Sequence, residues 1–586
     1  MNIAITGQGI VSAIGIGVQQ VMQSLREGKS GIGEMKHLQS VHHELPVGEV
    51  KLSNDEMKSM LGIDSAQPIS RTALMGIMAI KQAIDDAALP TEGKPLRIVL
   101  VSGTTVGGMD LAEMHYAELT QMRDLEFLRG YDCGNCTRQM ADYFGVFCDV
   151  STISTACSSA ANAIMLGARL IKAGMADVVV AGGTEALSKF HLNGFNSLMI
   201  LDHEPCRPFD DTRAGLNLGE GAAFVVLEPD TLAKSRGRKP LGYLAGYGNA
   251  CDAFHQTASS TDGEGAYLAM SQALSMANIA PADIQYVNAH GTGTPNNDAS
   301  ESVALKRIFG DNMPPVSSTK PFTGHTTSAS GSIETVICLL AMNHGFVPTN
   351  LNWAHPIPDG IIPCLGLDDV QLHYVLCNSF GFGGNDTSLL LSKEPVEATD
   401  DAPMKSESAV KVAAKVEINT EEELTAIRNY VKPLEARRMG KIMKSSLLSS
   451  LQALEQAGID MPDAIITATA YGCLDNSEKL LNQIEAEGET MLKPTYFMQS
   501  THNTISSNVA IRLRCHGYNV TYTQESHSLE WALRDASMLL RSGQCRSVLV
   551  GCHDESTPLF SKLMREAMGV ELPAIHSVAM VLTCGE

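Results

Sequence analysis

Two distant stretches of the sequence follow one plan. The first, Ser151–Ala186, reads STISTACSSAANAIMLGARLIKAGMADVVVAGGTEA, and the second, Val520–Glu555, reads VTYTQESHSLEWALRDASMLLRSGQCRSVLVGCHDE. Aligned without a gap, each has an extended lead-in, a helical segment, a glycine turn and an apolar run that ends near an acidic residue. Cys157 in the first stretch falls opposite Ser526 in the second. The pattern predicts one structural unit built twice, with the thiol in one copy only.

The segments that precede the two stretches repeat in the same order. ALMGIMAIKQAIDDAAL and IVLVSGTTVGGMD precede the first, and KIMKSSLLSSLQALEQAGI and AIITATAYGCLD precede the second. Residues 411–586 are therefore predicted to be a divergent copy of roughly the first third of the chain. The polar, acidic stretch KEPVEATDDAPMKSESAV, with two prolines, indicates a linker at 394–410. We divide the preceding region, 1–393, into halves at about residue 230.

Short apolar runs alternate with longer helical segments through the first 393 residues. RIVLVSG, DVVVAGG, AAFVVLE, IQYVNAH and TSLLLSK have the length and the Val, Ile and Leu content of buried strands. Between them lie segments with helical spacing of apolar residues, such as SSAANAIMLGARLIKAG and ASGSIETVICLLAMNHG. This alternation predicts an α/β protein with a largely parallel sheet between helices. A chain of 586 residues is longer than a single hydrophobic core usually supports, so we expect two or more domains.

Composition excludes several classes of function. The formal net charge is -22, so we expect no binding to nucleic acid or to an anionic membrane surface. The chain has no apolar run of membrane-spanning length, and its N-terminus reads as a strand, which predicts a cytoplasmic protein. The 14 cysteines are too sparse for a disulfide scaffold and fit reduced thiols. The lone C-x-x-C of Cys133 and Cys136 is interpreted as the start of a helix rather than a metal site.

Candidate chemistry gathers in four loops. Cys157 stands where an extended segment turns into a helix, a place where free N–H groups and the helix dipole favour a thiolate. His290 lies in NAHGTGTPNND after a strand, and Lys320 and His325 lie in STKPFTGH before a small-residue helix. NSFGFGGND is a glycine-rich turn before the last strand of this region. A cysteine at a helix start with two histidines in loops at strand ends suggests covalent thioester chemistry.

The motifs TACSSA, NAHGTGTPNND, STKPFTGH and NSFGFGGND resemble those of the β-ketoacyl-acyl carrier protein synthases, in the Cys–His–His class that elongates acyl chains. ITGQGIVSAIG and RPFDDTRAGLNLGEGAAFVVLEP resemble other parts of the same family. Thiolases would have a second cysteine in the last glycine-rich loop, and the initiating synthases would have asparagine at His325. The resemblance covers residues 1 to about 393. It implies a thiolase-like fold, in which two mixed five-stranded sheets are stacked between layers of helices.

The same resemblance implies a role for each site residue. Cys157 would carry the acyl chain, and His290 and His325 would stabilise, through Nε2, the enolate left when malonyl loses CO₂. Lys320, paired with Glu334, would orient the His325 loop, although a purely structural ion pair explains these two residues equally well. The backbone N–H groups of Cys157 and Phe380 would form the oxyanion hole, and Phe380 would also gate the pocket. The predicted substrate-binding residues are Thr292, Thr294, Gly381 and Phe382.

The resemblance also implies the partner and the cofactors. Substrates would arrive on the phosphopantetheine arm of an acyl carrier protein, with no metal and no further cofactor. Carrier proteins are acidic, as this chain is overall, so docking would depend on a few local Lys and Arg side chains. The pathway could be fatty-acid, polyketide or aryl-polyene synthesis, and the silent copy favours a specialised one.

The second unit resembles a truncated chain-length-factor subunit, a relative of the synthases that lacks the nucleophile. Its segment PTYFMQSTHNTISSNVA resembles the family region that borders the dimer interface and the partner's acyl pocket. We predict that 411–586 is catalytically silent and forms a half-thiolase layer. That layer would pack on a synthase unit, as a homodimer or a pseudo-heterodimer, because half a fold cannot cover both faces of its strands. The alternative for this unit is a decayed duplication that only stabilises the fold. For the whole chain, the alternatives to condensation are a non-elongating scaffold that binds carrier protein and a free-standing malonyl decarboxylase.

Overall fold

The computed structural model describes residues 1–89, 96–397 and 409–584. The first unit contains ten strands that run in one continuous hydrogen-bonded order, five in each half, with β1 against β7 where the halves meet. The first half has the order β4 (Asp149–Ile153), β3 (Ile98–Gly103), β5 (Val178–Glu185), β6 (Gly221–Pro229) and β1 (Ile3–Ser12). The second half has the order β7 (Gly242–Cys251), β13 (Asn385–Ser392), β12 (Tyr374–Gly381), β8 (Tyr286–Asn288) and β9 (Val316–Ser317).

Two central helices lie between the two halves of this sheet system. Helix α7 (Ser159–Lys172) packs on strands of both halves, and α13 (Ser330–His344) packs on β6 and β12. Both helices are buried along nearly their whole length, as their small and apolar residues predict. They approach closely, because a Cβ placed on Gly331 would lie 2.8 Å from the Cβ of Ala161. The prediction of a thiolase-like fold is confirmed.

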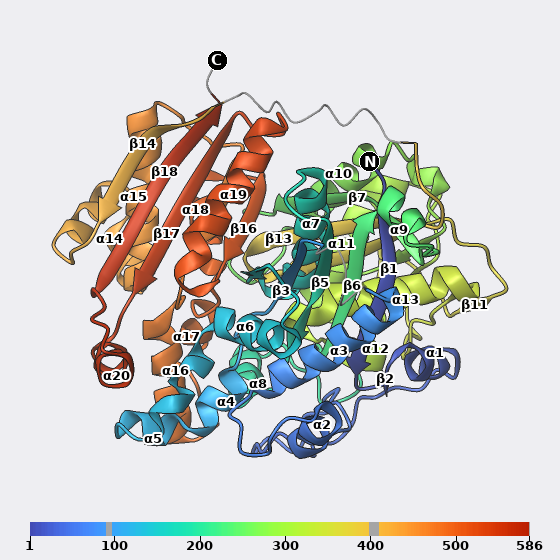
Figure 1. The fold of residues 1–586 in the computed structure, drawn as a ribbon, viewed down its shortest axis with the longest axis horizontal. Coiled ribbons are helices and arrows are strands. Elements are labelled where there is room, and N and C mark those ends of the chain that lie inside the picture. Colours follow the sequence, from blue (N-terminus) through green and yellow to red (C-terminus); the bar gives the residue numbers. More distant parts are fainter. Residues whose placement is uncertain (90–95, 398–408, 585–586) are drawn as a thin grey trace.

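Outer helices cover the remaining faces of the two halves (Figure 1). They include α3 (Arg71–Ala87), which packs on β1 and β6, and α10 (Glu264–Ala277), which packs on β7 and β13. Helix α6 (Cys133–Phe144) begins at Cys133, and both thiols of the C-x-x-C are buried, so the interpretation as a helix start is confirmed. Over the described ranges, no helix combines the length and the apolar character needed to cross a membrane.

The second unit repeats the first half of the first unit. Its strands have the same order and the same relative directions as β4-β3-β5-β6-β1. They are β16 (Tyr518–Tyr522), β15 (Ala464–Ala468), β17 (Ser547–Glu555), β18 (Ile575–Cys584) and β14 (Val410–Ile418). Of the predicted linker, residues 398–408 lie outside the described residues, and its last residue already begins β14.

Helices cover both faces of the second sheet without help from another unit. Helices α15 (Lys441–Ala457) and α18 (Thr504–Leu513) pack on one face, and α19 (Ser528–Arg541), the counterpart of α7, lies across the other (Figure 1). The predicted packing on a synthase unit is nevertheless present, because the core on the α19 side is continuous with the core of the first unit. Helix α19 differs from α7 in that it is not apolar all round.

Helix α19 turns a polar stripe outward where α7 is apolar. In the ungapped alignment, three buried residues of α7 are replaced by polar residues of α19. Ala161, Met165 and Ala168 correspond to Glu530, Arg534 and Ser537. Glu530 is exposed, and Arg534 forms ion pairs with Glu530 and with Asp149, both at 2.5 Å. In the first unit Ala161 on this side of α7 meets Gly331 of α13. In the second unit Glu530 is exposed, whereas Arg534 reaches Asp149 of the first unit, so this side of α19 is polar and only partly covered.

The two units meet edge to edge through an antiparallel joint between β4 and β16. Ser154 N–H donates to the Thr521 carbonyl at 2.9 Å, and Thr523 N–H donates to the Thr152 carbonyl at 3.0 Å. The joint connects the sheet of the first unit to the sheet of the second, and the two units lie side by side in Figure 1. A buried ion pair of 2.7 Å between Arg169 of α7 and Asp535 of α19 supports it.

We expect the 586-residue chain to have the mass of a monomer, 62.7 kDa, in solution. The edge of β4 is already hydrogen-bonded to β16, so a second copy cannot pair with that edge. Light scattering during size-exclusion chromatography measures this mass directly. A stable species of twice the mass whose subunits cross-link between β4 strands would contradict the expectation.

Candidate active site

Cys157 lies in a buried turn at the start of the central helix. The residues Ala156–Ser158 form one 3₁₀ turn before α7, and Ala156 has a φ of 50°. The side chain is 5% exposed, and burial raises the pKa of the thiol to about 12, although the nearby charge of Lys320 and local N–H groups act in the opposite direction. Loss of solvation therefore opposes the thiolate that the helix-start position favours, so the sulfur depends on its neighbours to give up the proton.

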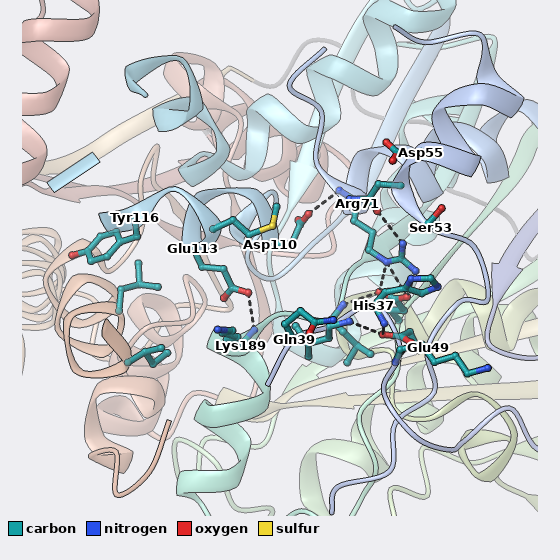
Figure 2. Close-up of a pocket in the computed structure, with 18 of the residues that line it drawn as sticks. His37, Gln39, Glu49, Ser53, Asp55, Arg71, Asp110, Glu113, Tyr116 and Lys189 are labelled. Carbon is teal, nitrogen blue, oxygen red and sulfur yellow. Dashed lines mark hydrogen bonds and ion pairs between the residues drawn. The ribbon is translucent and has the colours of Figure 1, made fainter. Parts of the chain in front are cut away.

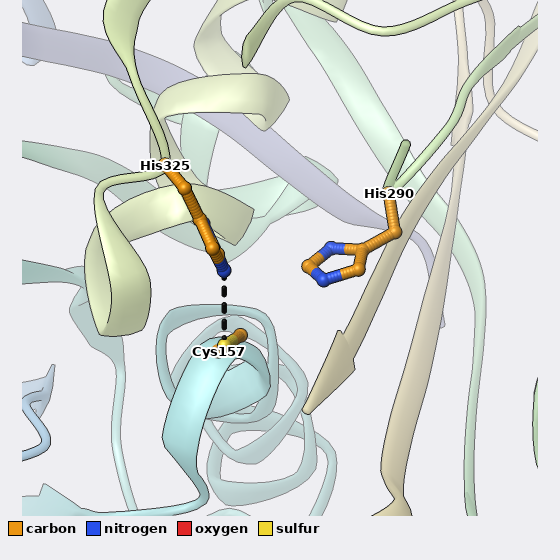
Figure 3. Close-up of side chains that lie close together, drawn as sticks. All are labelled: Cys157, His290 and His325. Carbon is orange, nitrogen blue, oxygen red and sulfur yellow. Dashed lines mark hydrogen bonds between the residues drawn. The ribbon is translucent and has the colours of Figure 1, made fainter. Parts of the chain in front are cut away.

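Both predicted histidines face the sulfur of Cys157 (Figure 3). His325 Nε2 lies 3.1 Å from Sγ, and His325 Nδ1 lies 3.0 Å from Ser330 Oγ, which fixes the orientation of the ring. The ring of His290 lies 5.3 Å from that of His325, centre to centre and nearly perpendicular. One potential ligand atom from each of the three side chains falls within 4.8 Å of the others. Three residues far apart in sequence therefore surround one small space.

The two histidines are neutral. Burial lowers the pKa of His290 and of His325 well below 6.5, and the positive charge of Lys320 lowers both further. Each neutral ring can donate one N–H bond and accept one. The Nδ1 atom of His290 has no hydrogen-bond partner among the described residues, so its Nε2 can present a proton to the space beside Cys157.

Lys320 and Glu334 form a buried ion pair next to the histidines. The Nζ to Oε1 distance is 2.5 Å, and the two side chains are 1% and 3% exposed. Lys320 is the first residue of α12 (Lys320–Thr323), directly before the His325 loop, and Glu334 lies within α13. The pair ties that loop to the central helix and places one positive charge near all three reacting groups.

Two buried carboxylates that sequence reasoning missed hold the histidine loops. Glu301, in α11 (Pro295–Phe309), accepts the N–H groups of His290 at 2.8 Å and Gly291 at 2.7 Å. Glu185, at the end of β5, accepts from the Ser328 hydroxyl at 2.5 Å beside the His325 loop. Glu185 ends a buried strand and Glu301 lies inside a helix that follows the His290 loop, and an acid in such a buried place needs hydrogen-bond donors.

The oxyanion-hole prediction needs a shift of two residues. Phe380 belongs to β12, and its ring packs 5.8 Å from that of His290. The backbone N–H that bonds the sulfur of Cys157 belongs to Phe382. Gly381 between them cannot be larger, because a Cβ there would lie 2.8 Å from the Thr155 carbonyl oxygen. The sequence F-G-F offered two aromatic positions, and strand pairing directs the first of them into the core.

The predicted substrate-binding threonines lie in the loop after His290. The hydroxyls of Thr292 and Thr294 are 2.9 Å apart, and Thr294 is the residue before α11. Thr292 is 5% exposed. The two hydroxyls form a small polar patch in the loop that follows His290. A substrate arm that contains amide groups could form hydrogen bonds with them.

Aromatic side chains from both units line the space beyond Phe382. Its ring stacks on Phe195 of α8 (Lys189–Ser197) with centres 5.6 Å apart. Phe195 in turn packs 5.2 Å from Phe497 of α17 (Pro494–Met498), which belongs to the second unit. A Cβ on Gly194 would lie 2.1 Å from the ring of Phe497. The second unit therefore supplies one wall of this aromatic cluster.

The counterpart of Cys157 in the second unit carries no comparable machinery. Ser526 is exposed, and its hydroxyl lies 3.4 Å from Nδ1 of the adjacent His527. The described part of the second unit contains only the counterpart of the first half, whereas both histidines and Lys320 belong to the second half of the first unit. The prediction that the second unit lacks chemistry of its own is supported by this placement.

A separate cavity of about 760 Å³ opens at the junction of the units (Figure 2). Its wall includes Leu481 and Ile484 of α16 (Leu474–Glu487) from the second unit. On the first-unit side, Asp110 accepts from the Arg71 N–H at 2.7 Å, and Glu113 accepts from Lys189 N–H at 2.7 Å. These carboxylates are satisfied by the protein itself, so the cavity offers no reactive group comparable with Cys157.

Comparison with known proteins agrees with the geometry. Family models described as "Beta-ketoacyl synthase, N-terminal domain" match residues 1–233 and 411–586, and one described as "Beta-ketoacyl synthase, C-terminal domain" matches 241–354. The chain is 34% identical over 410 residues to a 3-oxoacyl-[acyl-carrier-protein] synthase 2 of Vibrio harveyi, which covers 67% of this chain and 98% of the relative.

Solved structures give the same result for the fold. "The ishigamide ketosynthase/chain length factor" is 29% identical, covers 67% of this chain and 99% of its own, and superposes with a TM-score of 0.63. "PfaC Keto synthase-Chain length factor" is only 15% identical but covers 100% of this chain and 78% of its own, with a TM-score of 0.82. The second likeness extends the shared fold across both units.

The first unit thus combines both synthase domains with a cysteine and two histidines around one space, and the second unit repeats the N-terminal domain without the nucleophile. Relatives of this identity and coverage, together with the family models, fix the assignment. The chain belongs to the β-ketoacyl synthases, a family of acyltransferases.

Proposed function

We propose that this protein condenses an acyl chain held on Cys157 with malonyl on an acyl carrier protein, with loss of CO₂. The observation that carries the proposal is the convergence of Cys157, His290 and His325 on one buried space. Incubation with acyl- and malonyl-carrier protein should yield a β-ketoacyl-carrier protein two carbons longer than the acyl primer. Mass spectrometry of the carrier protein detects it, and unchanged malonyl- and acyl-carrier protein would contradict the proposal.

The first step is thioester exchange onto Cys157. His325 Nε2, 3.1 Å from Sγ, accepts the thiol proton as the sulfur attacks the acyl carbonyl. The C–S bond to the pantetheine breaks, and its sulfur leaves with the proton. The backbone N–H groups of Cys157 and Phe382 receive the developing oxyanion. A thiol with a pKa near 12 needs such a neighbouring base, because very little thiolate is present at neutral pH.

The second step forms the new C–C bond. Malonyl on the carrier protein loses CO₂, and the electron pair of the broken C–C bond remains as an enolate on the thioester. Neutral His290 donates an Nε2–H bond to the enolate oxygen. His325 does the same once its single proton has shifted from Nδ1 to Nε2, and Ser330 Oγ, 3.0 Å away, then donates to Nδ1. The enolate carbon attacks the acyl carbonyl on Cys157. The Cys157 C–S bond breaks, and the thiolate takes up one proton from solvent, which is the proton that the overall reaction consumes. Dry surroundings strengthen each of these donor contacts.

The neutral state of the histidines favours this role over acid catalysis. A positive ring would be a stronger donor, but burial and the charge of Lys320 keep both rings uncharged. We propose that Lys320 and Glu334 set this electrostatic state and hold the His325 loop. Thr292 and Thr294 would bind the phosphopantetheine arm, which we propose is the only prosthetic group that takes part.

The second unit serves, in this proposal, as a built-in chain-length subunit. It joins β4 through β16, and it contributes Phe497 to the aromatic cluster beside Cys157. Similar solved structures include ketosynthase–chain length factor proteins, which supports a pseudo-heterodimer within one chain. The fourteen free cysteines support a reducing, cytoplasmic location.

We expect Phe497→Ala to lengthen the product. The ring of Phe497 lies against Gly194 and Phe195, so its removal opens space at the floor of the acyl pocket. Chromatography with mass spectrometry of released chains gives the length distribution. Tyr496→Ala is the matched control, because the Tyr496 ring lies beside Lys479 and Lys493. A distribution that is unchanged in Phe497→Ala would show that the floor lies elsewhere.

Two rival functions fit the site less well. A non-elongating scaffold that binds carrier protein would not need the intact Cys157, His290 and His325. A free-standing malonyl decarboxylase would not need the nucleophile. The buried hydrogen bond between His325 and Cys157 favours the complete condensation over both.

A further inference from the structure

The active-site loop of the first unit is held by a side chain of the second unit. Asn503, directly before α18, donates through Nδ2 to the Phe382 carbonyl at 2.7 Å and to Asn385 Oδ1 at 2.6 Å. Phe382 begins the 3₁₀ turn Phe382–Gly384, and Asn385 begins β13. One fully buried amide group thus binds both ends of the turn.

A second asparagine of the second unit continues this contact. Asn385 Nδ2 donates to the carbonyl oxygen and to Oδ1 of Asn519 in β16, both at 3.0 Å. Ser506 Oγ of α18 donates to the same Oδ1 at 2.7 Å. The loop is therefore linked through Asn503 and Asn519 to two elements of the second unit, and none of these side chains is solvated.

The fit between the loop and α18 leaves no free volume. Gly383 has a φ of +83°, and a Cβ there would lie 2.7 Å from Ser507 Oγ and 2.8 Å from Asn503 Nδ2. The loop backbone consequently rests directly on the first turn of α18. A change at Asn503 is transmitted to the loop, because the close packing gives the loop little room to adjust independently.

We infer that Asn503 is a positioning residue for acyl transfer, acting from the second unit through the Phe382 backbone. The Phe382 carbonyl is bound by Asn503, and the N–H of the same residue faces the sulfur of Cys157. The two groups flank one Cα atom, so the Asn503 amide restricts the turn that carries the proposed oxyanion donor. The inference rests on the proposed function. It gives the silent unit a part in the first half-reaction, although it contributes no reacting atom.

The inference predicts a split between the half-reactions. Acyl transfer to Cys157 uses the Phe382 N–H, whereas malonyl decarboxylation uses the histidines, which Glu301 and Glu185 hold within the first unit. Asn503→Asp keeps the size of the side chain and replaces the donor by an acceptor that repels the Phe382 carbonyl. We expect it to slow acylation about hundredfold, the scale reported for a misplacement of about 1 Å, and to leave decarboxylation unchanged.

The experiment measures both half-reactions on the full chain. Intact-mass spectrometry follows acylation of Cys157 by acyl-carrier protein, and CO₂ release from malonyl-carrier protein is followed in the Cys157→Ala background. Asn508→Asp is the matched control, since Asn508 lies in the same helix and its amide contacts the Met443 carbonyl within the second unit. Asn503→Ala is the second variant should the aspartate interfere with folding, and a misfolded fraction would lower both rates together.

The outcomes separate the inference from the proposed function. A slow acylation with normal decarboxylation in the Asn503 variants, and neither change in Asn508→Asp, supports the inference. Equal losses in both half-reactions, or normal acylation, overturn it and leave the proposed function in place. A wild-type chain that performs neither half-reaction overturns the proposed function, and the inference falls with it.

Discussion

A chain with Cys157→Ala is expected to form no acyl-enzyme and no β-ketoacyl product, yet to release CO₂ from malonyl-carrier protein. The sulfur is the only thiol that faces both histidines in the described structure, whereas His290 and His325 remain in place without it. Loss of the nucleophile removes the covalent route altogether, so the condensation rate should fall below detection. Intact mass after exposure to acyl-carrier protein and trapping of released CO₂ measure the two half-reactions.

The controls use residues that share chemistry but not position. Cys148 is exposed, and Cys148→Ala should leave the acyl-enzyme signal as in the wild type. Ser526→Ala should leave turnover unchanged, since Ser526 is exposed and its hydroxyl lies 3.4 Å from the adjacent His527 ring. Peptide mapping of the wild type should place the acyl group on Cys157. An acyl group on any other cysteine would overturn the assignment of the nucleophile.

His290→Ala and His325→Ala are each expected to reduce decarboxylation by about a hundredfold to a thousandfold, or about 2.7–4 kcal/mol for one lost donor. In the proposed mechanism each buried ring supplies one of two neutral donors to the enolate oxygen. His325→Ala should also slow acylation, because the ring is 3.1 Å from the sulfur and accepts its proton. His290→Ala should affect acylation less, which separates the two roles.

The pH profile tests the protonation state on which this argument depends. A folded-state pKa well below 6.5 means that both rings remain neutral as the pH falls through 6.5. Decarboxylation should therefore not decline across the ordinary titration range of histidine. A decline in the decarboxylation rate centred near pH 6.5, if it disappears in one of the histidine variants, would contradict the neutral state of the rings. His191→Asn serves as the control for buried histidines, since its ring lies in the aromatic cluster.

Much of the first unit could be predicted because its motifs carry both local structure and chemistry. The strands over 98–103, 178–185 and 385–392 follow from short apolar runs, and the buried central helices follow from small and apolar residues. The duplication was visible because the order of elements repeats even where the residues differ. The positions of Cys157 and the histidines relative to their strands were likewise readable from the sequence.

The parts that escaped prediction depend on contacts between distant segments. Phe380 and Phe382 differ only in strand pairing, which determines whose N–H reaches the sulfur. The thiol state of Cys157 depends on complete burial, a property of the assembled core. Asn503 shows no signal in its own segment, because its function is defined by a loop more than a hundred residues earlier.

The polar stripe of α19 bears on how much of a synthase-like unit is needed to form a partner for a synthase. Glu530 and Arg534 stand where the first unit has Ala161 and Met165, so this side of α19 carries ion pairs in place of apolar side chains. The half of a synthase that joins β4 can therefore form a folded layer of its own beside the complete one. With its β16 edge and its polar α19, the second unit could be fused to another synthase whose β4 edge is free.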